Sequence, residues 1–268
     1  MESLARKCSE HGQMDTIQFY LTPVYNIIHS LKGLDERVLA PLTTYTSNEQ
    51  LLELSKKGSH RYHLGTLVLL EIMGHVILRR MDKAKLILDM CRSSVPEKRW
   101  VFYQVMTDFF LGLTACYLAR QSEQDDTQMV EVQVICDKLD RLRAHSKWNF
   151  ENKFLLLKAE YHFSKGEVTD AAKYYHNSID SANKHKFIHE EAIGCELAGY
   201  FYKEQGDETA SAAMFLRAHS VYSKWGAVHK ANTLPLGEDA SQKSEKYDIV
   251  ANKTNLIKKY ILDKQYEN

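Results

Sequence analysis

Apolar residues recur at helical spacing along most of this chain. In the segment 98–120 they follow steps of three and four residues, at Phe102, Val105, Phe109, Gly112 and Cys116. Such steps place side chains on one face of an α-helix, which completes a turn every 3.6 residues. Similar apolar stripes predict further helices over 150–165, 167–184, 187–205 and 207–224.

The N-terminal part of the chain shows the same pattern in shorter segments. It predicts helices over 16–31, 34–45, 48–57, 61–80 and 83–93, the last ended by Pro96. The polar stretch 121–128 predicts a loop, and no segment alternates apolar and polar residues as a half-buried strand does. We therefore expect an all-α fold. Because the breaks at 165–167, 183–185 and 205–207 are short, consecutive helices should pack as antiparallel neighbours.

An internal repeat links the two clearest pairs of helices. A shift of 40 residues aligns Gly166 with Gly206. The shift also places Ala159 on Gly199, His162 on Tyr202, Ala171 on Ser211, Tyr175 on Phe215 and Ser178 on Ala218. Small residues let two helices approach closely, and aromatic rings fill the space where the helices diverge. Glycine suits the left-handed conformation that ends a helix, and the acids Glu167 and Asp207 suit the start of the next one.

This order and spacing resemble the tetratricopeptide repeat, a helix–turn–helix unit of about 34 residues. The resemblance implies antiparallel helical hairpins stacked as an α-solenoid over residues 1–231, with the clearest copies at 152–184 and 192–224. A degenerate third copy starts at Gly74, with Met81 where the turn glycine should be. A generic helical bundle is the alternative.

The C-terminal part is polar. Residues 232–246 predict a linker, and 247–268 predict a lysine-rich helix. Its lysines could suggest binding to anionic lipid or RNA, but Asp248 and Asp263 among them favour a solvated surface helix.

Composition narrows the class of protein. The chain carries 35 basic and 35 acidic side chains, and 44% of its residues are hydrophobic. This excludes a typical disordered chain and disfavours a nucleic-acid partner, which usually requires a basic excess. The five dispersed cysteines contain no Cys-x-x-Cys pair and indicate a reducing, cytoplasmic location. The most apolar run, Leu64–Leu78, is only 15 residues long and contains Glu71 and His75, so we expect no membrane span.

Residues 150–234 carry a closer family resemblance. It rests on Lys158-Ala159-Glu160, Ala182, Glu190-Glu191-Ala192, Glu196-Leu197-Ala198, Phe201-Tyr202, and Tyr222-x-x-Trp225-Gly226-Ala227 followed by Lys230. The segment resembles the tetratricopeptide-like helical region of large multidomain signalling proteins. In these, a Ser/Thr-kinase-like domain and an AAA-type predicted ATPase precede that region, and a GAF domain and often a histidine kinase follow it. The resemblance implies a helical linker or regulatory region. It does not imply ATPase or kinase activity here, because the chain contains neither a phosphate-binding loop nor kinase motifs.

Motifs for catalysis, metals and cofactors are missing from the sequence. Two pairs of histidines are spaced so that both rings share a helix face: His185 with His189, and His60 with His63. Neither pair has a third and a fourth zinc ligand nearby in the sequence. We interpret them as surface or helix-end histidines, and Glu71 with His75 as a buried pair rather than an acid–base couple. We therefore expect no metal, no cofactor and no enzymatic activity.

The sequence favours a non-catalytic scaffold that binds a protein or peptide. In stacked hairpins the first helices line a concave groove. The repeat register nominates Lys153, Glu160, Phe163, Glu196, Tyr200 and Lys203 as groove residues. One alternative is a fragment of a larger ATPase or histidine-kinase signalling protein, whose other domains would be partners. Another is a helical enzyme with a pocket near His60, His63 or Glu71.

Overall fold

The described part of the chain is helical. The computed structural model describes residues 2–12, 14–33, 52–53, 63–94, 101–121 and 126–236, and within them no strand occurs. The all-α prediction is therefore confirmed for these residues. The predicted helices at 34–45 and 247–268, nearly all of 48–57, and the linker beyond 236 lie outside the described residues.

The N-terminal helices are short. They are α1 (Glu2–Glu10), α2 (Met14–Thr16), the π-helix η1 (Ile17–Leu21) and α3 (Thr22–Lys32). Three longer helices follow, which are α5 (Leu64–Ile77), α6 (Met81–Ser94) and α7 (Val101–Gln121). The remaining helices are α8 (Asp126–His145), α9 (Lys147–Ser164), α10 (Val168–Lys184), α11 (Ile188–Glu204), α12 (Glu208–Trp225) and α13 (Val228–Asn232).

Most of these bounds agree with the predicted helices, but the short helices α1 and α13 and the long helix α8 have no predicted counterpart. The largest difference is α8. It begins inside the stretch predicted as a loop and continues to His145. Its buried residues Met129, Val132, Cys136 and Leu139 recur at helical steps. The apolar stripe is thus present, but charged residues around it weaken the signal.

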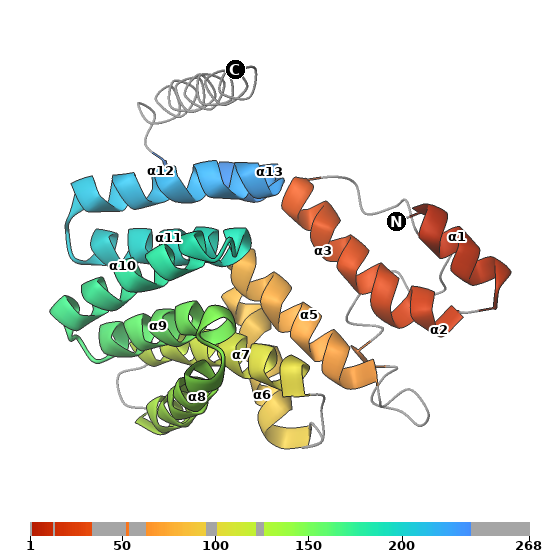
Figure 1. The fold of residues 1–268 in the computed structure, drawn as a ribbon, viewed down its shortest axis with the longest axis horizontal. Helices are drawn as coiled ribbons and strands as arrows, with labels where there is room; N and C mark the ends of the chain where they lie inside the picture. Colours follow the sequence, from red (N-terminus) through yellow and green to blue (C-terminus); the bar gives the residue numbers. More distant parts are fainter. Residues whose placement is uncertain are drawn as a thin grey trace, which may run out of the picture.

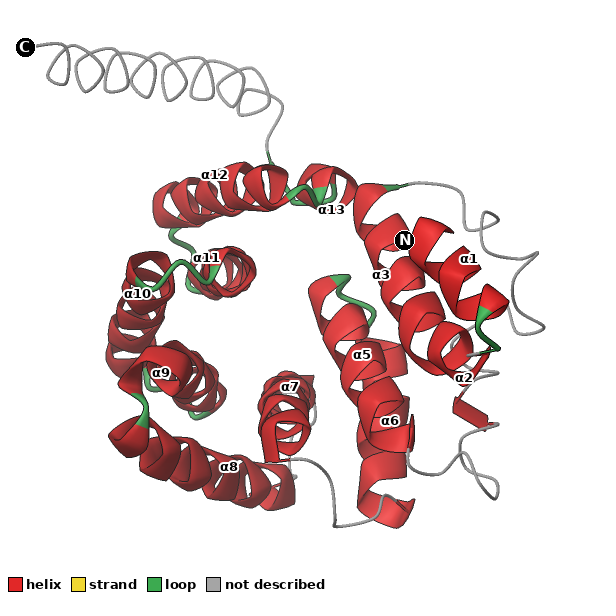
Figure 2. Cartoon of the chain, turned by 45° about the vertical axis from the view of Figure 1, so that its right-hand side comes forward, coloured by secondary structure: helices red, strands yellow, loops and turns green. Residues whose placement is uncertain are grey.

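The helices from α7 onward form two rows. In Figure 2, α7, α9 and α11 lie on the inside of a curve, and α8, α10 and α12 lie on its outside. Consecutive helices pack directly against one another, most extensively α9 with α10 and α11 with α12. Figure 1 shows the same succession of neighbours from another side. The paired packing is what the short connections predict.

The same turn joins successive helices at five places. Each contains one residue with a left-handed backbone: Arg79, Gly166, Lys186, Gly206 and Gly226. In each turn, the N–H of the following residue bonds to a carbonyl five residues back, as Glu167 does to His162 at 2.9 Å. The turn glycines Gly166 and Gly206 therefore adopt the predicted conformation. In the α5–α6 turn the left-handed residue is Arg79, so the proposed turn position at Met81, the first residue of α6, is wrong by two residues.

Small residues let the helices of each pair approach closely. Gly199 of α11 lies against the Phe215 ring of α12, and a Cβ at this glycine would lie 2.7 Å from the ring. The hydroxyl of Ser211 donates to the Gly199 carbonyl at 2.9 Å across the same contact. In the preceding pair, Ala159 and Ala171 are fully buried. The small and aromatic positions of the predicted repeat are thus interior positions.

The last described helix meets a helix from the N-terminal part of the chain. Helix α13 packs against α3, beside α12, as both views show. A Cβ at Gly33, just after α3, would lie 2.9 Å from the His229 ring of α13. The row of helices therefore closes on itself through a contact between segments almost 200 residues apart.

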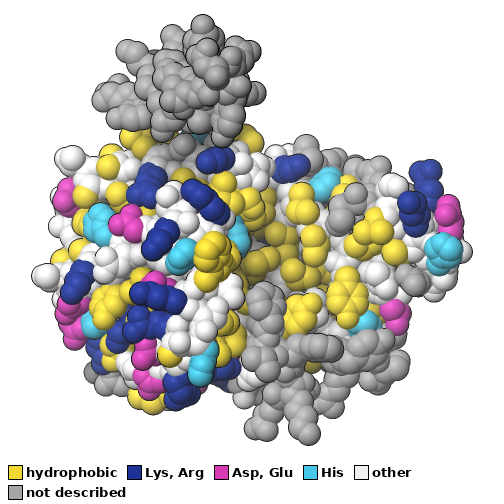
Figure 3. Space-filling model, in the orientation of Figure 1, with side chains coloured by type: hydrophobic (Ala, Val, Ile, Leu, Met, Phe, Trp, Pro, Cys, Tyr) yellow, Lys and Arg dark blue, Asp and Glu magenta, His cyan; other side chains and the backbone are white. Residues whose placement is uncertain are grey.

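The surface charges, the apolar character of the helices and the state of the cysteines can be compared with the sequence expectations. On the face drawn in Figure 3, Lys and Arg side chains gather with histidines over α8–α12. None of the helices in the described ranges combines the length and apolar character needed to cross a bilayer. All five cysteines are described, and no disulfide joins them. Burial raises the pKa of Cys136 and Cys195 to about 12, so these thiols stay protonated at neutral pH.

Candidate functional site

Four of the six predicted groove residues lie inside the packed helices. Their exposed fractions are 4% for Lys153, 2% for Glu160, 8% for Phe163 and 2% for Glu196. Their side chains contact other parts of the chain rather than an open groove. Of the other two, Tyr200 is half-buried and Lys203 is exposed.

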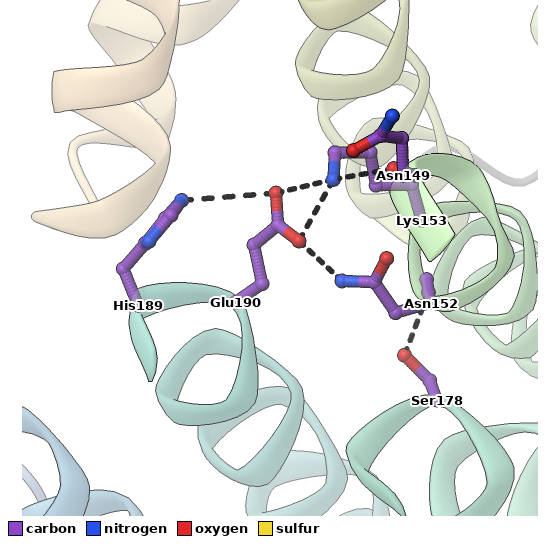
Figure 4. Close-up of polar contacts among 6 residues, drawn as sticks. All are labelled: Asn149, Asn152, Lys153, Ser178, His189 and Glu190. Carbon is purple, nitrogen blue, oxygen red and sulfur yellow. Dashed lines mark hydrogen bonds and ion pairs between the residues drawn. The ribbon is translucent and has the colours of Figure 1, made fainter. Parts of the chain in front are cut away.

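Lys153 is the centre of a buried polar cluster between α9 and α11 (Figure 4). Its Nζ lies 2.7 Å from Oε1 of Glu190 and donates to Oε2 at 2.9 Å. It also donates to the backbone carbonyl of Asn149 at 2.9 Å and lies 4.5 Å from the centre of the Phe187 ring. These contacts compensate the cost of removing both charges from water.

Asn152 completes the cluster from the next position on α9. Its amide nitrogen donates to Oε2 of Glu190, and its backbone carbonyl accepts from the Ser178 hydroxyl at 2.8 Å. Its side-chain oxygen is buried without a hydrogen-bond partner in the structure. The cluster therefore joins three helices, α9, α10 and α11, through one carboxylate and one amide.

His189 lies at the open side of this cluster. Its Nε2 is 3.7 Å from Oε1 of Glu190, and its ring stacks on Trp225 with centroids 5.6 Å apart. Burial lowers the pKa of His189, and the Lys153 charge adds to that effect, while Glu190 opposes it. At pH 7 the imidazole is therefore neutral, and its contact with Glu190 is a polar contact rather than an ion pair.

Two further buried carboxylates follow a common arrangement. Glu160 of α9 accepts a hydrogen bond from Tyr175 of α10 and pairs with Arg120 of α7 at 2.8 Å. Glu196 of α11 accepts from Tyr222 of α12 at 2.8 Å and pairs with Lys230 of α13 at 2.6 Å.

In each of these two hairpins, a glutamate of the inner helix thus accepts a hydrogen bond from a tyrosine of the outer helix. The same glutamate forms an ion pair with a cation of another helix. Burial, reinforced by the glutamate charge, raises the pKa of Tyr175 and Tyr222 well above its usual value, so both phenols stay protonated.

Phe163 and Tyr200 both carry an arginine over their rings. The Arg120 guanidinium lies 4.2 Å from the centre of the Phe163 ring. The Arg79 guanidinium lies 4.3 Å from the Tyr200 ring and 5.3 Å from the Tyr117 ring. Tyr200 borders a pocket with Arg79, whereas Lys203 lies one helical turn further on, at the α11–α12 turn. The structure does not bring the six residues together into one surface.

The histidines considered as metal ligands have other contacts. His185 stacks on Trp148 with centroids 4.8 Å apart, at the end of α10, and His189 lies in the first turn of α11. Both are helix-end histidines, as expected. His75 lies 3.2 Å from Glu71 in the buried pair that the sequence predicts. His63 contacts the Tyr20 hydroxyl at 3.1 Å, and His60 lies outside the described residues.

A different group could offer ligand atoms to a metal. His162, Glu167 and Asp170 bring one ligand atom each within 4.8 Å of the others at the α9–α10 turn. Glu167 and Asp170 are exposed, and the His162 ring already contacts Glu167. Exposed acidic groups of this kind are common without a metal ion, so no metal is assigned to this turn.

Three residues that the structure makes prominent are not among the residues predicted from the sequence: Arg79, Trp148 and Asn152. Arg79 and Asn152 gain their roles only from long-range packing, so no local pattern marks them. Trp148 is 57% exposed, and a tryptophan next to Lys147 at a helix start is a local signal that could have been noted.

The comparisons with known proteins found no relative. No protein-family model matches the chain, and no curated protein or solved structure matches it. The resemblance of residues 150–234 to the helical region of signalling proteins therefore stays a prediction.

Proposed function

We propose that the chain is a non-catalytic interaction module, built as a tetratricopeptide-like α-solenoid, that binds an acidic protein segment with an apolar anchor. The repeated turn, the two rows of helices and the repeated glutamate–tyrosine pair support the solenoid interpretation. Such arrays use surfaces formed by several successive repeats to bind their partners.

The partner-binding surface is the edge where α9 and α11 begin and α10 and α12 end. We call it the lysine edge and define it by Lys147, Trp148, Lys184, His185, Lys186, Lys224 and Val228. Stacking of Trp148 on His185 and of His189 on Trp225 joins the helix ends along this edge. The edge thus runs across two hairpins.

The charges of this edge favour an acidic partner. Lys184, Lys186 and Lys224 are exposed, and within the described residues none of them pairs with a carboxylate. The neighbouring acids Glu190 and Glu191 are buried in pairs with Lys153 and Arg217. Acidic side chains of a partner would therefore meet cations whose charge is not neutralised locally.

The exposure of Trp148 carries the proposal. With 57% of its surface exposed and one ring face on His185, it offers a large, rigid apolar contact. Tryptophan is among the residues that most often dominate binding energy in protein interfaces. Val228, 51% exposed on the same edge, adds a second apolar contact.

The test is a selection from a displayed peptide library with the purified chain. We expect enrichment of acidic peptides that contain an aromatic or aliphatic anchor. Trp148→Ala, and separately the double variant Lys184→Glu/Lys186→Glu, should weaken the selected peptides at least tenfold. The matched control is Lys203→Glu, an exposed lysine at the opposite ends of the helices, which should bind as wild type does.

Two results would contradict the proposal. One is enrichment of peptides without acidic residues. The other is equal affinity of the selected peptides for wild type and both lysine-edge variants, once circular dichroism has shown that the variants are folded. An interaction with ATPase or sensor-kinase domains, and the fragment interpretation, stay predictions of the sequence resemblance.

A further inference from the structure

A second site lies where the row of helices closes. A pocket of about 220 Å³ is bordered by the end of α3, the α5–α6 turn, α11 and α13. Its polar lining consists mainly of Ser30, Arg79, Arg80, Tyr200, His229 and Lys230. No carboxylate is among the lining residues of this pocket, which we call the Arg79 pocket.

Arg79 is held in place by an unusual backbone. Its φ of 58° puts it in the left-handed region, where three of the equivalent turns have glycine. An arginine in this conformation costs free energy, and such strain concentrates at functional sites. The turn directs its side chain to Tyr200 and Tyr117, whose rings lie 4.3 and 5.3 Å from the guanidinium carbon.

Arg79 donates one side-chain hydrogen bond to Tyr200, and its packing on the aromatic rings leaves its other N–H groups available. A guanidinium packed on a ring face is still able to donate from its edge, which suits bidentate contact with phosphate or carboxylate. Within the described residues, neither Arg79 nor Arg80 forms an ion pair. The two guanidinium charges therefore have no compensating carboxylate.

Lys230 contributes little additional charge to the pocket. It is 2% exposed, and its Nζ pairs with Glu196 at 2.6 Å, so its charge is balanced within the chain. The Tyr200 and Ser30 side chains add hydroxyl groups, and His229 adds a ring nitrogen. The pocket thus combines about two uncompensated positive charges with several neutral hydrogen-bonding groups.

Volume limits the ligand. The volume of the pocket is about 220 Å³. This is below the range of about 300–1,000 Å³ that drug-sized ligands use. A small tetrahedral dianion fits this volume and carries enough charge to neutralise both guanidinium groups. A single carboxylate would neutralise only one of them.

We propose that the Arg79 pocket binds a phosphate group, as inorganic phosphate, as a small phosphate monoester or as a phosphorylated side chain. The proposal does not depend on the lysine edge, because the two sites share no residue. Arg79 would bind the phosphate oxygens through its edge, with Arg80 as the second cation and Tyr200 as a hydroxyl donor.

The experiment is calorimetric titration of the full chain with inorganic phosphate, glycerol 3-phosphate and a phosphoserine peptide, with succinate as the carboxylate comparison. We expect one saturable site for at least one of the phosphates, with succinate at least tenfold weaker. The relative affinities of the three phosphates show which source fits best.

Two glycine variants form a matched pair. Arg79→Gly removes the guanidinium but keeps a residue suited to the left-handed turn, so the fold should be preserved. Lys165→Gly removes a cation from the α9–α10 turn, at a position outside both the pocket and the lysine edge. We expect at least tenfold weaker phosphate binding in Arg79→Gly and wild-type binding in Lys165→Gly. Absence of saturable binding of all three phosphates, equal affinity for succinate, or wild-type affinity in Arg79→Gly would overturn the proposal.

Discussion

Lys153 of α9 and Glu190 of α11 form an ion pair that is almost completely removed from solvent. The distance from Nζ to Oε1 is 2.7 Å, and the two side chains are 5% and 4% exposed. Glu190 also accepts from Asn152, and Lys153 also donates to the Asn149 carbonyl. The pair therefore fixes one inner helix against the next, at a place where the sequence predicts groove residues.

Loss of one partner should be costly, because the other charge is left buried. Lys153→Met and Glu190→Gln should each lower the free energy of unfolding by about 3 kcal/mol. The double variant should lose clearly less than the sum, because no unpaired charge is left in it. Urea unfolding of the four proteins measures these values.

An exposed pair provides the comparison. Lys147 lies 3.2 Å from Glu151 and is 72% exposed. Lys147→Met should change the free energy of unfolding by less than about 0.5 kcal/mol. If the Lys153 and Glu190 effects are additive, or as small as that of Lys147, the ion pair does not couple the two helices.

His189 should titrate below its usual range. Burial and the Lys153 charge lower its pKa below the usual histidine value of about 6.5. The unfolded chain therefore binds more protons between the folded pKa and 6.5, and the free energy of unfolding falls as the pH falls through that window. The chemical shift of the His189 ring proton, followed by NMR, gives the folded pKa directly.

The effect of each neighbouring charge on the His189 pKa can be tested by removing that charge. Lys153→Met removes a positive charge and should raise the His189 pKa, whereas Glu190→Gln removes a negative charge and should lower it further. A His189 midpoint above 6.5 in the wild type, or a shift in the same direction in both variants, would contradict this electrostatic description.

Much of the fold follows from local patterns. Helical periodicity predicts α9 to α12 closely, and the repeat identifies Gly166 and Gly206 as turn residues with left-handed backbones. It also identifies Gly199 and Phe215 as interior positions. These features depend on helix geometry and on steric size, which a sequence records directly.

The candidate sites depend on contacts that a sequence does not record. Glutamates such as Glu160 and Glu196 are usually exposed to solvent, so the sequence does not indicate their burial. They are buried here because Arg120 and Lys230 of other helices form ion pairs with them. Arg79 and Tyr200 are 121 positions apart and meet only because the row of helices closes. Groove residues assigned from the repeat register alone therefore proved to be mostly interior.

Gly199 should not tolerate even a methyl group. A Cβ there would lie 2.7 Å from the Phe215 ring, and this ring is 1% exposed. Overpacking costs about 1–3 kcal/mol, which exceeds the gain of about 1 kcal/mol from replacing a helical glycine by alanine. Gly199→Ala should therefore lower the free energy of unfolding by about 1 kcal/mol in urea.

Gly194 of the same helix is the matched control. Its Cβ would lie 3.1 Å from Cγ1 of Ile179, an aliphatic side chain that is able to shift slightly. Gly194→Ala should be close to neutral, because helix propensity and crowding nearly cancel. A Gly199→Ala variant more stable than Gly194→Ala would show that α11 and α12 are not in close contact at Gly199.

Replacing Lys186 by glycine should make the folded chain more stable. It is exposed and adopts a φ of 65°, which costs an L-residue about 1–2 kcal/mol. Glycine removes that strain but adds about 0.5–1 kcal/mol of backbone entropy to the unfolded chain. The turn itself is kept, because its hydrogen bonds from Lys186 to Asn183 and from Phe187 to Ala182 are made by the backbone.

Lys186→Gly should raise the free energy of unfolding by about 0.5 kcal/mol, as measured in urea. In Lys173→Gly, an exposed position inside α10, the same replacement should instead cost about 1 kcal/mol. Destabilisation of both variants would mean that the left-handed turn between α10 and α11 is not formed at Lys186.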